Sequence, residues 1–326
     1  MASDPLTTVN FLSPVQDLMP QVESRMYSLA DAYHPELGAA IKHLLSSGGK
    51  RVRPATALLV GGMLGADQEQ LITLASAIEL LHTATLVHDD LIDGALLRRG
   101  IATINAQWTP AATVLTGDFI FAIAARQAAE TNSVAVMRLF AETLAIIVNG
   151  EINQLFTSHG LASRDNYYKR IFAKTASMFE LATGAAALLS SVDDTMLEQS
   201  RSFGYEIGMA FQIVDDVLDF TGEQTTVGKP VASDLRQGLI TLPALYYYED
   251  NPDDPDMASI LKGNYLNSHV LDRLVEEIRR SGAVDHALEE ANQYTDRGLE
   301  ILSRMPPGPE HDALVDLTCY VINRSM

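Results

Sequence analysis

The sequence predicts an all-α protein, and three observations support this prediction. Aromatic residues make up only 7% of the 326 residues, which are dominated by alanine and leucine. No segment alternates β-branched and polar residues between turn signals, as a half-buried strand would. Apolar residues instead recur at helical spacing in long runs that end at glycine and proline. We therefore expect a single-domain bundle over residues 1–326, with about 12 to 13 helices.

The breaks in the apolar pattern place these helices in order along the chain. Gly48-Gly49, Thr109-Pro110, Gly222 and Pro306-Pro307-Gly308-Pro309 each interrupt the pattern. None of these breaks is a long linker, which favours one domain. The helices are expected at residues 15–33, 35–47, 55–64, 67–94, 111–131, 133–158, 163–191, 194–221, 234–249, 255–263, 267–281, 283–304 and 309–325.

Charge and composition argue against several classes of protein. The 23 Lys and Arg residues face 42 Asp and Glu residues, so the net charge is −19. Nucleic acid is therefore not an expected partner, because phosphate binding needs a basic face. The hydrophobic share of 47% supplies a sizeable core. Cys319 is the single cysteine, which excludes an internal disulfide and agrees with a reducing compartment.

The same reading predicts a cytoplasmic protein without a transmembrane segment. No basic residue precedes Arg25, so neither a secretory nor a transit leader is expected. Residues 71–88 are the best candidate for a membrane span, but Glu79 and His82 interrupt them. We expect a buried core helix there.

Two of the predicted helices end in the same acidic pattern, Asp-Asp-x-x-Asp. The first cluster contains Asp89 and Asp93, and the second contains Asp215 and Asp219. Residues at i and i+4 project from one helix face about 6 Å apart. Carboxylates this close repel one another unless a cation lies between them. Mg²⁺ suits such a pair, because it combines few carboxylates with water and substrate phosphates. The pattern thus predicts both a metal and a phosphorylated ligand.

One such cluster could equally be a solvated helix end. Two clusters that each follow apolar helix residues, 80–87 and 209–211, favour helices that line a cavity. His82 precedes Asp89 by two turns, and Gln212 precedes Asp215 by three residues. For each of these two side chains, the sequence allows either a position in the core or a contact with the ligand.

Basic residues gather in tight groups despite the acidic balance. Residues 48–54 place three cations beside two glycines, and Arg98-Arg99-Gly100 follows the first acidic cluster. Glycine lets an anion approach the backbone, and arginine matches phosphate bidentately, although basic residues also mark solvated helix ends. Lys174-Thr175 lies in an apolar run, and Lys229 follows the second cluster. Lys174 could either extend its charged end out of the apolar surface to solvent or hold a phosphate. Metal clamps and separate cations in an apolar pocket suit departure of a diphosphate and formation of a carbocation.

These motifs resemble those of the trans-isoprenyl diphosphate synthases, also called polyprenyl synthetases. They occur in family order over most of the chain: Gly-Gly-Lys-Arg-Val-Arg-Pro at 48–54, His82, the first acidic motif at 89–93, Arg-Arg-Gly at 98–100, Gly-Asp at 117–118, Gly-Glu at 150–151, Lys-Thr at 174–175, Phe-Gln at 211–212, the second acidic motif at 215–219, Gly-Lys-Pro at 228–230, Asp-Leu at 234–235 and Thr-Leu-Pro at 241–243.

The resemblance implies helices around a deep central cavity and head-to-tail condensation of an allylic diphosphate with isopentenyl diphosphate. Asp89, Asp93 and Asp215 would hold three Mg²⁺ on the allylic diphosphate, with Asp219 in support. The same group would be contacted by Arg98, Lys174, Thr175, Gln212 and Lys229. Isopentenyl diphosphate would be bound by Lys50, Arg53, His82 and Arg99. The catalytic residues implied are Asp89, Asp93, Lys174, Asp215 and Lys229.

The mechanism implied is ionisation, condensation and elimination, with the released diphosphate, not a side chain, as the usual acceptor of the last proton. One residue departs from the family pattern: Leu239 stands where a lysine is common. We interpret this change as a weakened diphosphate contact. Homodimers are usual in such a family.

Product length depends on how far the growing chain can extend below the first acidic motif. Short-chain relatives have a bulky residue four or five positions before the motif, whereas this chain has Thr85 and Ala84. We therefore expect a medium or long chain product. The alternatives are a geranylgeranyl or other short-chain synthase, a terpene cyclase or head-to-head synthase, and a silent partner subunit of a heteromeric enzyme.

Overall fold

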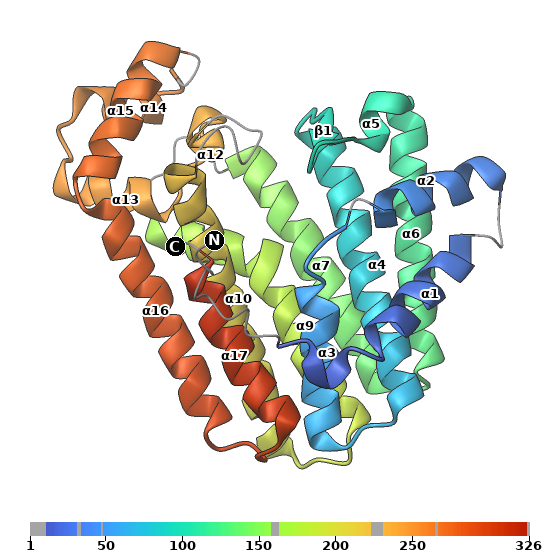
Figure 1. Cartoon of the computed structure of the whole chain (residues 1–326). Helices are drawn as coiled ribbons and strands as arrows, with labels where there is room; N and C mark the ends of the chain where they lie inside the picture. The colour runs from blue at the N-terminus through green and yellow to red at the C-terminus, as the bar shows by residue number, and fades with distance from the viewer. Residues whose placement is uncertain are drawn as a thin grey trace, which may run out of the picture. The chain divides into compact units, whose positions relative to one another are not determined.

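The structure, a computed structural model, describes residues 11–30, 34–46, 48–157, 163–222, 231–264 and 267–324. These residues are mostly helical, and their only strands are two that pair over two residues each (Figure 1). The all-α prediction is thus confirmed. Lys229 lies outside the described residues.

The helical elements follow one another along the chain with these bounds: η1 (Ser13–Val15), α1 (Met19–Ala30), α2 (Pro35–Ser46), α3 (Val52–Leu64), α4 (Gln68–Ile92), α5 (Ile104–Gln107), α6 (Pro110–Glu130), α7 (Val134–Thr157), α8 (Arg164–Ile171), η2 (Phe172–Ala176), α9 (Ser177–Leu189), α10 (Asp194–Thr221), α12 (Ser233–Arg236), α13 (Leu242–Asp250), α14 (Pro255–Leu261), α15 (Ser268–Arg280), α16 (Ala283–Leu302) and α17 (Pro309–Asn323).

Close contacts divide the chain into two compact units, and each is described by itself. Unit 1 comprises Met1–Ala141, Leu181–Phe203 and Leu299–Tyr320. Unit 2 comprises Glu142–Glu180, Gly204–Gly298 and Val321–Met326. The single domain expected over residues 1–326 stays a prediction.

The helix predicted over residues 234–249 is wrong, because two shorter helices, α12 and α13, replace it. Gly238 between them has a φ of 80°, a left-handed conformation that ends the first helix. Thr241 is extended and precedes Leu242-Pro243, where proline suits the first turn of α13. The local turn chemistry therefore outweighed the apolar periodicity.

Two further departures lie beside the predicted site. A hairpin that the sequence did not predict pairs β1 (Leu97–Arg98) with β2 (Ile101–Ala102). Its turn residues Arg99 and Gly100 have φ values of 51° and 76°, as a two-residue type I′ turn requires. In the helix expected over 163–191, residues Phe172–Ala176 form a π-helical turn between α8 and α9.

The core of unit 1 is built around α4, which runs beside α3 and α6 (Figure 1). Helices α3 and α4 approach each other closely at Gly61, where an added Cβ would lie only 2.1 Å from Cδ2 of Leu71. Of the described helices, α4 is the one long and apolar enough to cross a membrane, and 78% of its apolar window is buried inside the protein. The sequence prediction of a buried core helix there is confirmed.

The core of unit 2 includes the second half of α10. Ile213, Val214 and Phe220 on this helix are fully buried. A Cβ on Gly208 would lie only 2.5 Å from Cα of Ala176, so glycine lets α10 pack directly against the π-helical turn. This packing sets the second acidic cluster beside Lys174 and Thr175.

Candidate active site

The first acidic cluster lies at the carboxyl end of α4 in unit 1. Asp67 caps the start of the helix by accepting a hydrogen bond from the Gln70 amide at 3.0 Å. Along the second half, His82, Thr85 and Asp89 remain partly accessible, while Leu81 and Ala84 are buried. The predicted alignment of His82 with Asp89 on one stripe is therefore confirmed.

The three aspartates of this cluster differ in their surroundings. Asp90 is buried and accepts a hydrogen bond from Nε of Arg98 at 2.8 Å. Asp93 caps the helix end, where its amide donates to the Asp89 carbonyl at 2.8 Å, and it is exposed. Asp89 and Asp93 therefore share the accessible part of the cluster, and Asp90 holds Arg98 on the hairpin in place.

The hairpin turn reaches the basic segment that precedes α3. Nη1 of Arg99 donates to the carbonyl oxygen of Gly48. A Cβ on Gly49 would lie 2.7 Å from the same nitrogen, so the guanidinium occupies the space that glycine leaves open. Two basic groups that lie about 50 residues apart in sequence thus meet in unit 1.

His82 lies among arginines from both groups. Desolvation by the surrounding protein, and then the positive charges of Arg53, Arg99 and Arg98, lower the pKa of His82 well below its ordinary value of 6.5. The imidazole is therefore neutral, so one of its ring nitrogens donates a hydrogen bond and the other accepts one. Of the predicted isopentenyl diphosphate site, the structure brings Arg53, His82 and Arg99 together.

Lys50, the fourth residue predicted for this site, makes a contact that the sequence did not predict. Its Nζ lies 4.9 Å from the ring centroid of Tyr320, on α17, as a cation–π pair. No local pattern distinguishes Tyr320 from an ordinary residue of an amphipathic helix. Only the return of α17 within unit 1 places its ring beside the basic segment.

The second acidic cluster lies on α10 in unit 2. Asp215 pairs with Arg324 at 2.8 Å, and Arg324 also stacks over the ring of Phe211 at 3.7 Å. Asp219 accepts hydrogen bonds from the Ser233 amide and hydroxyl and from the Asp234 amide, at 2.9 to 3.2 Å. Asp219 therefore anchors the start of α12.

Asp216 forms the centre of a buried polar network. It accepts hydrogen bonds from the Tyr167 hydroxyl at 2.7 Å and from Nε2 of Gln212 at 2.8 Å. Burial and then the charge of Asp234 raise the pKa of Asp216 to about 7. Oε1 of Gln212 in turn accepts a hydrogen bond from the Thr175 hydroxyl at 2.6 Å. The predicted ligand contacts Thr175 and Gln212 therefore lie together beside the second cluster.

Lys174 belongs to the π-helical turn that precedes α9. Its Nζ lies 3.1 Å from Oε1 of Glu151 on α7. The approach of α7 to this turn depends on Gly150, whose Cβ would lie 2.4 Å from Cβ of Ala173. Wider π turns occur often at functional sites, and here the turn presents Lys174 and Thr175. The Gly-Glu motif on α7 and the Lys-Thr motif on the π-helical turn therefore form the two sides of one contact.

The two clusters can be tested against the requirements of a metal. Among the described residues, no three His, Cys, Asp or Glu side chains gather closely enough to form a protein-only metal site. Each cluster instead offers few carboxylates, which fits Mg²⁺ that takes its other ligands from water and phosphate. Asp215 already accepts a cationic partner in Arg324, so its carboxylate is placed to bind positive charge.

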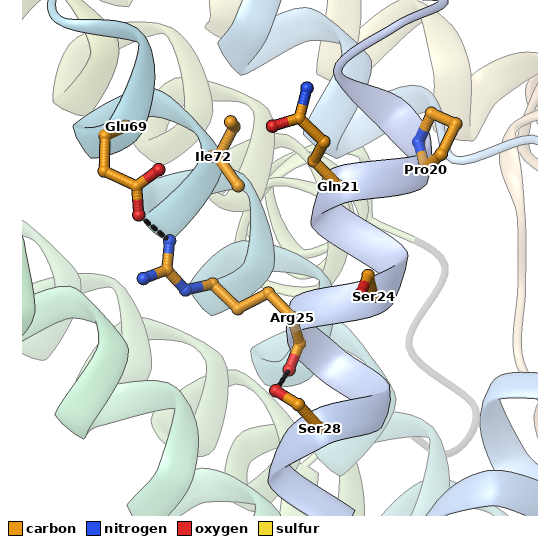
Figure 2. Close-up of a pocket in the computed structure, with 7 residues that line it drawn as sticks. All are labelled: Pro20, Gln21, Ser24, Arg25, Ser28, Glu69 and Ile72. Atoms are coloured by element: carbon orange, nitrogen blue, oxygen red, sulfur yellow. Dashed lines mark hydrogen bonds and ion pairs between the residues drawn. The ribbon is translucent and has the colours of Figure 1, made fainter.

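A separate hollow between α1 and α4 contains none of the predicted site residues (Figure 2). It is an open hollow of about 440 Å³, and it is lined by Pro20, Gln21, Ser24, Arg25, Ser28, Glu69 and Ile72. The only cation in it, Arg25, pairs with Glu69 at 2.8 Å and donates to Thr73. The hollow is therefore no part of the acidic and basic groups described above.

Comparison with known proteins identifies the class of this fold and site. A sequence model of the polyprenyl synthetase family matches residues 34–278. The chain belongs to this family and is a prenyltransferase.

Among its relatives, the heptaprenyl diphosphate synthase component 2 of Geobacillus stearothermophilus is 34% identical over 316 residues, which cover 97% of both chains. The crystal structure of heptaprenyl diphosphate synthase from Staphylococcus aureus matches with a TM-score of 0.90 at 34% identity, over 98% of this chain and 100% of the other. A polyprenyl synthase from Caulobacter crescentus CB15, crystallised with calcium and isoprenyl diphosphate, matches with a TM-score of 0.90 at 34% identity over 97% of both chains.

Proposed function

We propose that this prenyltransferase condenses isopentenyl diphosphate head-to-tail (1′-4) with an allylic diphosphate and releases a trans-polyprenyl diphosphate of medium or long chain length. The observation that carries the proposal is the group of Arg53, His82 and Arg99 in unit 1. A terpene cyclase or head-to-head synthase uses no isopentenyl diphosphate and therefore needs no site for it. The Caulobacter relative, crystallised with calcium and isoprenyl diphosphate, supports both the ligand class and a divalent cation.

The acidic clusters are the proposed metal-binding groups. Asp89 and Asp93 are suitable metal ligands because they share the accessible part of the first cluster. Asp215 is suitable because its carboxylate already pairs with a positive group, the guanidinium of Arg324. Asp219 supports them through its hold on Ser233 and Asp234. Three Mg²⁺ ions, when bound, neutralise the allylic diphosphate as it leaves.

The remaining proposed roles belong to side chains that bind and orient. Lys174, set by Glu151, supplies a point charge to the allylic diphosphate, and Lys229 and Arg98 add further positive charge. Thr175 orients the Gln212 amide by donating to its Oε1. Nε2 of Gln212 gives one hydrogen to Asp216, and its second hydrogen is a neutral donor for the same group. Lys50 joins Arg53, His82 and Arg99 on isopentenyl diphosphate. Apolar residues of α4 keep water from the carbocation.

A primer assay tests this proposal directly. The purified chain is incubated with labelled isopentenyl diphosphate, Mg²⁺ and geranyl, farnesyl or geranylgeranyl diphosphate, and the products are separated by reversed-phase chromatography. We expect incorporation that depends on primer and metal and that ends at one medium or long chain length. Absence of incorporation by the chain alone would contradict the proposal and favour a silent subunit.

Product length is proposed to depend on the residues below Asp89 on α4. Thr85 lies on the partly accessible stripe, and the small Ala84 beside it is fully buried. Ala84→Phe fills this region, so the variant should release a shorter product, whereas the small change Ala84→Ser should leave the length unchanged. Unchanged chain lengths for Ala84→Phe would refute this model of the cavity floor.

The chain is proposed to work as a cytoplasmic homodimer. On the part of α7 in unit 2, the exposed apolar residues Val148, Ile152 and Leu155 follow one another at helical spacing, and Phe156 is 84% exposed. A second copy is the proposed occupant, whereas the Geobacillus relative is named as one component. Light scattering should give twice the chain mass, and Leu155→Glu should give the single mass. A single mass for the wild-type chain would contradict the proposal.

A further inference from the structure

Arg51 lies between the proposed substrate-binding residues Lys50 and Arg53, but its side chain points into the protein. Only 11% of that side chain is exposed. Nη1 donates to Oε1 of Glu79 on α4, Nη2 donates to the Leu45 carbonyl on α2 at 3.0 Å, and Nε lies 3.5 Å from Glu23 on α1. Arg51 thus joins three helices of unit 1 to the start of a fourth, α3.

The backbone at Arg51 needs these contacts. Arg51 is the residue before the first turn of α3, and its φ of 48° is left-handed, which is uncommon for a residue other than glycine. Such a conformation persists where the surroundings hold it in place. The guanidinium contacts are therefore placed to define the direction in which the flanking side chains leave the chain.

Glu79 links this residue to the helix of the first acidic cluster. It precedes His82 by three residues, so the two lie one turn apart on α4. Its side chain is only 8% exposed, and a carboxylate this buried near an anion site is tolerable because Arg51 compensates its charge. At the other end of the segment, Arg99 holds Gly48. The basic segment is thus fastened to the site at two points.

We propose that Arg51 and Glu79 are positioning residues for isopentenyl diphosphate, and this inference rests on the function proposed above. The pair fixes the basic segment against α4, so that Lys50 and Arg53 meet His82 on one diphosphate. Arg51 itself does not bind the substrate, since its donors are directed at Glu79 and Leu45.

The test compares KM for the two substrates in variants of the full chain. Arg51→Gly removes the side chain and permits the left-handed backbone. We expect its KM for isopentenyl diphosphate to rise about 10- to 100-fold, as the affinity of a metal site falls when an outer partner that orients a metal ligand is lost. KM for the allylic diphosphate should stay within about threefold, a change of less than 1 kcal/mol. An equal rise in both would overturn the inference.

Glu79→Gln separates a positioning role for Arg51 from direct binding. Loss of the carboxylate releases Arg51, so a direct ligand would bind the substrate better and lower its KM. A positioning residue loses its anchor, and KM for isopentenyl diphosphate rises. A fall in this KM would therefore overturn the inference.

The double variant Arg51→Met/Glu79→Leu separates positioning from stability. Replacing a buried ion pair by apolar residues commonly preserves the fold. We expect a variant that still unfolds cooperatively and well above the assay temperature, but a KM for isopentenyl diphosphate that remains raised. A wild-type KM in this variant would show that the pair only stabilises the fold.

Arg25→Gln is the matched control. It breaks the ion pair between Arg25 on α1 and Glu69, which lies on α4 as Glu79 does. Both KM values should stay at the wild-type level. A wild-type chain that consumes no isopentenyl diphosphate would overturn the proposed function and this inference together. A working wild type with unchanged KM in Arg51→Gly would overturn this inference alone.

Discussion

The two acidic clusters have the same Asp-Asp-x-x-Asp pattern but different surroundings. In unit 1, Asp93 is exposed at the end of α4, and only the middle aspartate of its cluster is buried. In unit 2, α10 continues to Thr221, and the chain returns so that the Ala232 amide donates to the Asp219 carbonyl at 2.8 Å. The Asp219 carboxylate then caps the next segment.

The middle aspartates differ in the same way. Asp90 pairs with the cation of Arg98, whereas Asp216 meets the neutral donors Tyr167 and Gln212 and lies near the charge of Asp234. A cation stabilises the ionised carboxylate, and burial beside another acid opposes ionisation. Equal spacing in sequence therefore does not make the corresponding residues of the two clusters equivalent.

Substitution of the first aspartate should have the same effect on catalysis in both clusters. Asp89→Asn and Asp215→Asn each remove a proposed metal ligand, and each should lower kcat about 1000-fold, or roughly 4 kcal/mol. Steady-state kinetics over a range of Mg²⁺ concentrations measures this. Asp165→Asn alters an exposed helix pair with Lys169 and should leave kcat unchanged. Full activity in either first variant would remove that residue from the site.

Substitution of the last aspartate, Asp93 or Asp219, should have different effects in the two clusters. Asp93→Asn is expected to lower kcat about 100-fold, because the carboxylate is proposed to bind metal. Asp219→Asn keeps an oxygen that can accept from Ser233, so about a tenfold loss together with a lower melting temperature is expected. Equal losses without a change in melting temperature would mean that Asp219 binds metal as Asp93 does.

The buried middle aspartate of the second cluster should make the stability of the protein depend on pH. In the folded protein the pKa of Asp216 is raised to about 7 from its ordinary 3.8. The folded state therefore keeps a proton that the unfolded chain loses, and the free energy of unfolding decreases as the pH rises from about 4 to about 7. Urea unfolding of the metal-free protein measures it. Asp216→Asn should flatten the curve, and an unchanged slope would contradict the assignment.

The smallest effect is expected at Leu239, which follows α12 near the second cluster. Restoring the common family residue with Leu239→Lys adds one cation, and turnover should stay within about tenfold, or roughly 1.4 kcal/mol. A gain of several hundredfold would show that this cluster is limited by the missing charge. Leu239→Met, which adds no charge, is the matched control.

Much of the fold followed from apolar periodicity and helix breakers. The expected 67–94 and 194–221 helices agree closely with α4 and α10, because both sequences are long, apolar and clearly bounded. The 234–249 prediction failed because a left-handed glycine divides that segment. The short β hairpin depends on backbone pairing over two residues, too short for a period to be recognised.

The candidate site followed less completely. Spacing on one helix predicted that His82 and Asp89 share a stripe, since helix geometry alone determines it. Tyr320, Arg324 and Tyr167 were missed, because each contacts its cluster from a distant part of the chain. Arg51 was counted with its basic neighbours, and only its burial distinguishes it from them.

The sequence by itself determined which residue types could bind metal and diphosphate, and on which helices they lie, because the helical repeat depends on local geometry. The tertiary structure decided how deeply each of these charges is buried and which protein groups it meets. It buried Asp90 and Asp216, capped α12 with Asp219 and turned Arg51 inward, and left Asp93 exposed. The physical reason is that desolvation and pairing depend on neighbours that the chain brings together only on folding.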